Sequence, residues 1–193
     1  MTAVVRFRGE NLRSVSNVEL LETSSLNILV GPNGAGKTSV LEGIHILGSG
    51  RSFRTRQLRT VVRRGEEFLR VTGSVDLEHG GGLPVHVGVE RSGKGLTIRA
   101  AGQPVAQTSA LARLLPLLVI RPESQDFFTG ASEERRRVLD WGVFHVEPEY
   151  LALHSRYARS LKQRNAALRQ RLGLRDVAIW DMELIHAGLA LNE

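Results

Sequence analysis

The chain has 193 residues, 41% of them hydrophobic and 24% charged, which is typical of a globular protein with one domain or a domain and part of a second. A formal net charge of +6 favours an anionic partner, which would be nucleic acid or an acidic membrane surface. Charge alone does not distinguish such a protein from a merely basic soluble one. The absence of cysteine excludes disulfides and thiolate metal sites, and no apolar stretch reaches about 18 residues, so we expect a cytoplasmic protein without a membrane partner.

The first predicted elements are three short strands and a helix. Apolar residues at 4–7 and 18–21 indicate two strands, and the apolar run at 26–30 indicates a third, buried strand. Residues 31–38 then read Gly-Pro-Asn-Gly-Ala-Gly-Lys-Thr. Apolar residues recur at helical spacing from Val40 to Leu47, and Gly48 to Gly50 favour the end of that helix.

The eight residues match the complete phosphate-binding loop pattern G-x-x-x-x-G-K-[ST]. Glycines let the backbone turn so that its N–H groups face phosphate oxygens, Lys37 supplies a point charge, and the Thr38 hydroxyl can bind Mg²⁺. The alternative is a glycine-rich turn with an incidental lysine, but a strand before the loop and a helix after it favour nucleotide binding. The predicted ATP-binding residues are Gly31, Pro32, Asn33, Gly34, Ala35, Gly36, Lys37 and Thr38.

A basic segment and a β-rich region follow the loop helix. Residues 51–64 carry six arginines, and the runs 68–75, 83–89 and 96–100 alternate with glycine-containing turns, which indicates an antiparallel meander. A helix at 109–115 precedes a strand-like apolar run at 117–120.

The remainder of the chain is predicted to be helical. One helix starts at Ser132, a second covers 150–172 with Gly173 as its stop, and a third runs from about Trp180 to the end. We therefore expect a nucleotide-binding domain at residues 1–121 and a helical domain at 122–193. The last helix has no cap, so we expect the helical domain to be incomplete at its C-terminus.

The chain lacks the second acidic element that an ATP-hydrolysing P-loop protein needs. Arg121 and Pro122 stand after the apolar run 117–120, where the acids would be expected. Asp181 follows another apolar run, but the helical recurrence of Leu184 and Leu191 favours a helix start there. We assign no catalytic residue.

Several stretches closely resemble the RecF family of bacterial replication and recombination-repair ATPases, which are related to SMC heads. They are residues 27–42, 50–55, 135–142, 161–168 and 180–184. The resemblance runs along nearly all of the chain but covers only the N-terminal half of the family's length. It implies an α/β P-loop NTPase, with an ABC/SMC-head-like lobe I (a mixed sheet plus an antiparallel β meander) followed by the start of a helical lobe II.

The resemblance also implies a function. Two heads of this family bind ATP and Mg²⁺ between them, form an ATP-dependent homodimer and clamp single-stranded or gapped DNA. With RecR and RecO they help RecA load at gaps and support the SOS response. The family has weak DNA-stimulated ATPase activity, but its signature and second acidic motifs lie in the absent half, so we expect hydrolysis by this chain to be near background. The alternatives are a non-catalytic nucleotide-binding fragment and a P-loop phosphotransferase, for which we find no acceptor site or catalytic acid.

Two further sets of residues follow from charge and from the resemblance. Gln125 is a candidate Q-loop residue, as in related ATPases, with a polar hinge as the alternative. Ser124 and Gln125 stand where the family's pattern is Pro-Glu-Asp-Leu-like, so no precise role is carried over to Glu123. The predicted DNA contacts are arginines, some of which can instead be solvated or, for the first two, approach the nucleotide. They are Arg51, Arg54, Arg56, Arg59, Arg63, Arg64, Arg135, Arg136 and Arg137.

Overall fold

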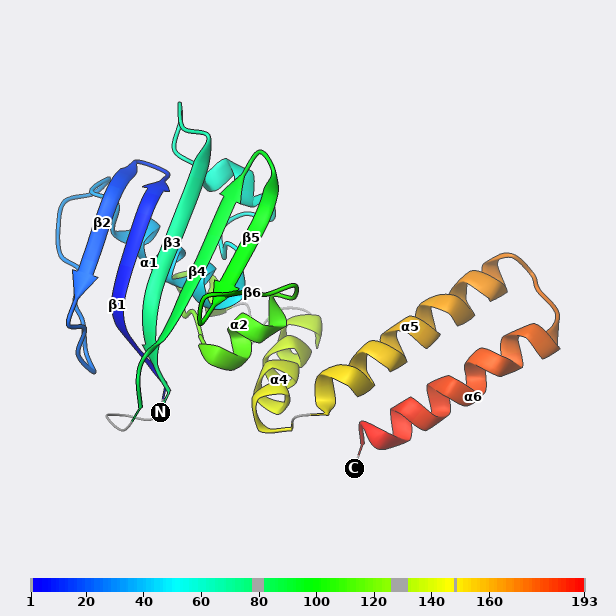
Figure 1. The fold of residues 1–193 in the computed structure, drawn as a ribbon. Coiled ribbons are helices and arrows are strands. Elements are labelled where there is room, and N and C mark those ends of the chain that lie inside the picture. Colours follow the sequence, from blue (N-terminus) through cyan, green and yellow to red (C-terminus); the bar gives the residue numbers. More distant parts are fainter. Residues whose placement is uncertain (1, 78–81, 126–131, 148, 193) are drawn as a thin grey trace. The chain divides into compact units, whose positions relative to one another are not determined.

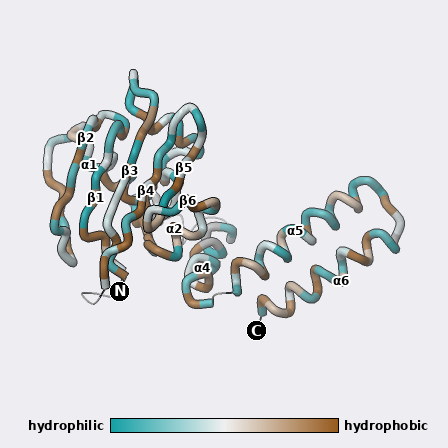
Figure 2. The backbone as a smooth tube through the Cα atoms, viewed as in Figure 1, coloured by the Kyte–Doolittle hydropathy of each residue, from teal (hydrophilic) through white to brown (hydrophobic). Residues whose placement is uncertain are grey.

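A computed structural model describes the backbone of residues 2–77, 82–125, 132–147 and 149–192 (Figure 1). The chain divides into two compact units, Met1–Arg121 and Pro122–Glu193. Hydrophobic and hydrophilic residues alternate along the strands of the first unit and along the helices of the second (Figure 2).

The first unit is built on a six-stranded sheet with the strand order β2-β1-β3-β4-β5-β6. Every pairing in it is antiparallel. The predicted meander is therefore confirmed, whereas the mixed sheet expected in this lobe is not found among the described residues. The strands are β1 (Ala3–Leu12), β2 (Val15–Leu21), β3 (Phe68–Asp76), β4 (Val85–Ser92), β5 (Gly95–Ala100) and β6 (Gln103–Pro104).

Helix α1 (Lys37–Ser49) packs against one face of this sheet. Ile46 and Leu47 of α1 are fully buried, as is Phe7 of β1. Small residues allow the helix to lie close to the strands, since a Cβ on Gly43 would stand 2.8 Å from Phe7 Cζ and one on Gly73 would stand 2.5 Å from Leu47 Cδ2. Shorter elements complete the unit: the 3₁₀ helix η1 (Leu58–Val61) and the helix α2 (Ser109–Leu114).

Two segments expected to form strands do not do so. Residues 26–30 and 117–120 pair with no described strand, and their apolar side chains are mostly exposed: Ile28 75%, Val30 88% and Ile120 81%. A strand needs a neighbour to satisfy its N–H and C=O groups. The prediction of a buried strand before the phosphate loop is therefore wrong for the described part of the chain, although half-buried Leu29 packs on the core.

The described residues of the second unit form η2 (Pro122–Gln125), α4 (Ser132–Val146), α5 (Tyr150–Arg169) and α6 (Leu174–Ala190). Helices α5 and α6 pack side by side as a hairpin (Figure 1), with Ser160, Ala167, Val177 and Ala187 buried. Two ion pairs join them, Arg156 with Glu183 at 2.8 Å and Arg164 with Asp181. No helix in the described residues combines the length and apolarity needed to cross a bilayer.

The boundaries of these helices differ from the predicted ones. Helix α6 begins at Leu174 rather than near Trp180, and Gly173 is its N-cap rather than the end of α5. Leu161 and Leu168 of α5 are exposed, at 36% and 47%. The small residues Ser160 and Ala167 are buried instead, because they permit close approach of the two helices.

Candidate nucleotide-binding site

The phosphate loop leads directly into α1, as the motif predicts. Its last glycine, Gly36, is the N-cap of the helix, and both Gly34 and Gly36 are left-handed, with φ of 84° and 93°. These conformations favour glycine because a side chain would be strained there. The residue types at 34 and 36 are therefore set by the backbone path of the loop.

The backbone N–H groups at the start of α1 are available to a ligand. The first-turn N–H groups of an α-helix have no acceptor within the helix, and their dipoles add to a partial positive charge. No side chain caps this end among the described residues, and the first turn carries no acidic residue. The loop residues 31–35 are exposed, so the N-terminus of α1 is accessible to an anion.

Lys37 supplies the side-chain positive charge of the site. Its Nζ donates hydrogen bonds to the backbone oxygens of Gly31 at 2.7 Å and Pro32 at 2.8 Å, so the ammonium group lies over the loop. An anionic oxygen can replace a neutral carbonyl as acceptor, because charge-assisted hydrogen bonds are the stronger ones. The neighbouring Thr38 side chain is exposed beside it. Amides, an ammonium group and a hydroxyl thus gather at the predicted ATP-binding loop.

Replacing Gly36 with alanine is expected to cost more stability than replacing Gly34. Both substitutions impose a left-handed conformation that costs roughly 1–2 kcal/mol. Only at Gly36 would the new Cβ also collide with β2, at 2.4 Å from Val15 Cγ2, whereas nothing lies within 4 Å at Gly34. Such overpacking adds roughly 1–3 kcal/mol. Urea unfolding followed by circular dichroism measures both, and a Val15→Ala background should recover part of the Gly36→Ala loss. Equal losses for the two variants would contradict this account.

A buried carboxylate lies one turn beyond the loop and was missed by sequence reasoning. Glu42 of α1 is fully buried and accepts two hydrogen bonds from Arg13, at 2.6 Å from Nε and 2.8 Å from Nη2. Ser52 Oγ donates to the same carboxylate at 2.5 Å, and Arg54 Nη1 lies 3.6 Å away. The only signal in the sequence is an acid on the apolar face of α1.

These contacts set the protonation state of Glu42. Burial raises the pKa of its carboxyl, but hydrogen bonds from Arg13 and Ser52 and the charges of Arg13 and Arg54 outweigh burial, so the pKa lies below the ordinary value of 4.5. The carboxylate is therefore ionised near neutral pH. It joins α1 to the β1–β2 turn and to the start of the basic segment.

The basic segment after α1 is partly structural. The Ser52 hydroxyl accepts hydrogen bonds from the backbone N–H groups of Arg54 and Thr55, which fixes the turn. A cavity of about 530 Å³ is lined by residues 50–56 and Leu58, among them Arg51, Arg54 and Arg56. A second cavity of about 410 Å³ is lined by Arg56, Arg59 and Arg91, among others.

The remaining predicted site residues lie at the end of the basic segment and in the second unit. Arg63 is half-buried and Arg64 exposed at the end of the basic segment. Arg135 and Arg136 lie on α4, and Arg136 Nη2 donates to Ser132 Oγ at 3.2 Å. The side chains of Arg137 and Gln125 lie outside the described residues.

Acidic residues suited to a metal do not gather elsewhere in the described ranges. No group of three or more His, Asp or Glu residues there could hold a metal ion. Asp181 is inside α6 and pairs with Arg164, which confirms that its apolar approach is helical rather than a strand. Thr38 therefore remains the predicted Mg²⁺ contact, through a bound nucleotide.

Comparison with known proteins places the chain in a family. The family model of the AAA domain matches residues 6–99. The DNA replication and repair protein RecF of Xanthomonas axonopodis pv. citri (strain 306) is 45% identical over an alignment of 193 residues, and the match covers 98% of this chain and 52% of that relative. The chain thus spans about half the length of the curated relatives it matches.

Solved structures show the same fold. The structure described as that of "the recombination mediator protein RecF-ATP in RecFOR pathway" has a TM-score of 0.86 at 22% identity, covering 98% of this chain and 52% of that one. A structure from work on ATP-driven dimerization and DNA-stimulated activation of SMC ATPases has a TM-score of 0.57 at 16% identity, covering 72% of this chain and 98% of that one. These likenesses confirm the predicted P-loop fold of the RecF and SMC-head type. The chain belongs to the RecF family, and it corresponds to the N-terminal half of the family's proteins.

Proposed function

We propose that this chain binds ATP through residues 31–38, with Mg²⁺ at the Thr38 hydroxyl. The observation that carries the proposal is the uncapped N-terminus of α1, at which the loop amides and the Lys37 ammonium group meet. Backbone donors and a positive dipole end are suited to a triphosphate. The existence of a RecF structure with ATP supports the same ligand here.

We further propose that the chain is the nucleotide-binding part of an ATP-switched DNA clamp that acts in replication and recombinational repair. The relatives' names, a DNA replication and repair protein and a recombination mediator protein, support a role in replication and recombinational repair. In this proposal ATP stabilises a homodimer on single-stranded or gapped DNA, RecR and RecO act with it, and RecA loads at the gap in support of the SOS response. The exposed arginines of the basic segment contact DNA phosphates.

The alternatives differ in what happens to the nucleotide. The nucleotide-binding part of a switch binds ATP but does not hydrolyse it on its own. A phosphotransferase consumes ATP, and a loop without a binding function binds no nucleotide. We expect calorimetric titration of the full chain with ATP to show saturable binding that weakens when EDTA removes Mg²⁺, and phosphate release near background. Robust turnover would overturn the switch assignment, and the absence of heat would overturn nucleotide binding itself.

The DNA part of the proposal has a separate test. We expect fluorescence anisotropy with labelled gapped DNA to give a dissociation constant that rises with salt, because each neutralised phosphate releases counterions. A plot of log K against log salt concentration should have a negative slope of several units. A flat plot would remove DNA binding from this half of the protein while leaving ATP binding intact.

A further inference from the structure

The sheet of the first unit has a second face, opposite to α1, that carries a polar hollow. Along β1 the side chain of Phe7 is buried on the helix side while Arg6 and Arg8 are exposed on the other. The hollow on this outer face has a volume of about 380 Å³. We call it the outer hollow; its polar lining consists of Arg6, Arg8, Thr72, Ser74, His86 and Arg99, together with Glu19.

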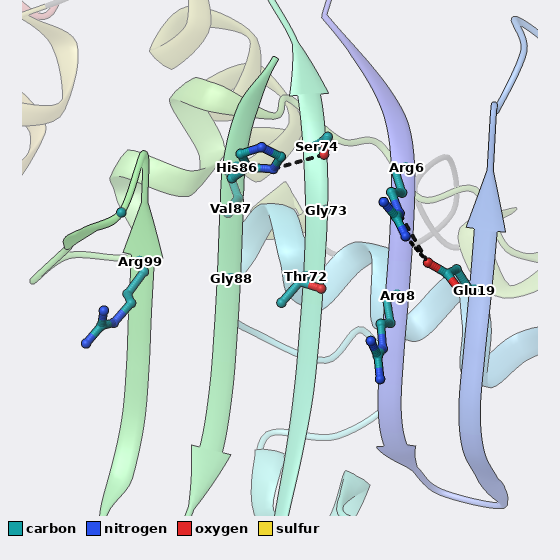
Figure 3. A pocket seen from close by; sticks show the side chains of 11 residues that line it. Arg6, Arg8, Glu19, Thr72, Gly73, Ser74, His86, Val87, Gly88 and Arg99 are labelled. Atoms are coloured by element: carbon teal, nitrogen blue, oxygen red, sulfur yellow. Dashed lines mark hydrogen bonds and ion pairs between the residues drawn. The ribbon is translucent and has the colours of Figure 1, made fainter. Parts of the chain in front are cut away.

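Strand register places the two outermost cations on one line across the sheet. Arg8 of β1 lies opposite Thr72 of β3, Thr72 opposite Gly88 of β4, and Gly88 opposite Arg99 of β5. Three strand spacings of about 4.8 Å put the backbones of Arg8 and Arg99 about 14 Å apart. Figure 3 shows these arginines on opposite sides of the hollow, with Thr72 and Gly88 between them.

The centre of the row is open because its residues are small. A Cβ added at Gly88 would meet only Thr72 Cγ2 at 3.6 Å and a backbone oxygen at 4.0 Å, which are ordinary contacts. The glycine is therefore not required by packing against the sheet. Its missing side chain leaves the floor of the outer hollow free.

The charges of the lining favour an anion. Arg6 pairs with Glu19 at 2.5 Å and Arg8 with Glu10 at 2.9 Å, but these groups are exposed, with 58% of the Arg6 and 51% of the Arg8 side chain accessible. Exposed ion pairs contribute little and can exchange partners. Arg99 forms no ion pair with any residue in the described part of the chain.

Further polar groups add to this preference. Ser74 Oγ lies 3.0 Å from His86 Nδ1 on the same face, so a hydroxyl and an imidazole stand beside the arginines. His86 is the only lining residue with a ring, so the hollow offers no platform on which successive bases would stack. The chemistry is that of phosphate recognition without base recognition.

We propose that the outer hollow binds the phosphodiester backbone of a nucleic acid, as a contact surface additional to the arginines of residues 51–64. The inference rests on the proposed DNA-binding function. A row of about 14 Å is wider than one phosphate group, and the same length of duplex axis, with a charge from each strand every 3.4 Å or so, spans about four phosphates of each strand. Arg8 and Arg99 hold the outer phosphates of that row, and the open floor at Gly88 admits the backbone between them.

The test compares paired variants of the full chain in DNA titrations over a range of salt. Arg8→Gln with Arg99→Gln should weaken binding roughly tenfold and reduce the salt slope by about two. Gly88→Glu should weaken binding, and Gly88→Gln, which has the same size without the charge, should weaken it less. Arg70→Gln is the matched control, because Arg70 is on the same face but pairs with Glu90 at 2.7 Å outside the hollow.

The outcomes separate this inference from the proposed function. If the unmodified chain binds DNA with a negative salt slope, and the double variant and both Gly88 variants keep its affinity and slope, the outer hollow is not the contact surface although the DNA-binding proposal stands. If the unmodified chain does not bind, both fail. Phosphatidylserine vesicles are titrated in parallel: losses there with no loss on DNA would assign the hollow to a membrane surface and overturn the inference.

Discussion

Replacing Lys37 with alanine is expected to weaken ATP binding roughly 100-fold, or about 3 kcal/mol, since hydrogen bonds to charged groups contribute about 1.5–3 kcal/mol. The ammonium group now donates to the Gly31 and Pro32 carbonyls in an exposed position. Its loss should therefore change the free energy of unfolding by much less than the free energy of binding. Calorimetric titration with ATP and Mg²⁺ measures the change in the free energy of binding, and urea unfolding measures the change in the free energy of unfolding.

Two variants make the Lys37 result specific. Lys94→Ala removes the same charge from the exposed turn between β4 and β5 and should leave ATP affinity unchanged. Lys37→Arg keeps the charge but replaces a compact ammonium group with a planar fork, so it should recover only part of the affinity. Saturable binding of equal strength in the Lys37→Ala chain would show that the loop does not hold the triphosphate.

Local patterns predicted the elements whose partners are close in sequence. The meander of β3, β4 and β5 and the helix α1 follow from alternation, turn residues and helical spacing. The strand at 26–30 was predicted wrongly because a strand depends on a neighbour, which no window of sequence reveals. The P-loop itself was recognisable because its chemistry fixes residue types at fixed spacing.

The sites that the sequence did not reveal are assembled from distant residues. Glu42 meets Arg13 from 29 positions earlier and Ser52 from 10 positions later. The outer hollow depends on the register of four strands, so the alternation of Arg6 and Arg8 with buried residues was visible, but their alignment with Arg99 was not. Pairing between strands, rather than composition, decides which exposed charges become neighbours.

Replacing Glu42 with glutamine is expected to lower the free energy of unfolding at pH 7 by roughly 3 kcal/mol, the scale for breaking a buried ion pair. The variant leaves Arg13 without its anionic partner. Arg13 lies in the β1–β2 turn, where its backbone is left-handed with φ of 52°. Glu19→Gln is the matched control, since the pair it breaks with Arg6 is exposed and should contribute much less to stability than the buried pair.

The stability that Glu42 contributes should also depend on pH. Because its pKa is lowered in the folded state, the contribution is complete above about pH 4.5, the ordinary value, and is lost as pH falls through the folded-state pKa. The difference between the unmodified chain and Glu42→Gln should therefore be largest near neutral pH and shrink in acid. Circular dichroism is the suitable probe, because Trp141 and Trp180 both lie in the second unit and their fluorescence reports on that unit. A difference that stays constant down to pH 3 would mean that the carboxylate charge does not stabilise the link between α1 and the β1–β2 turn.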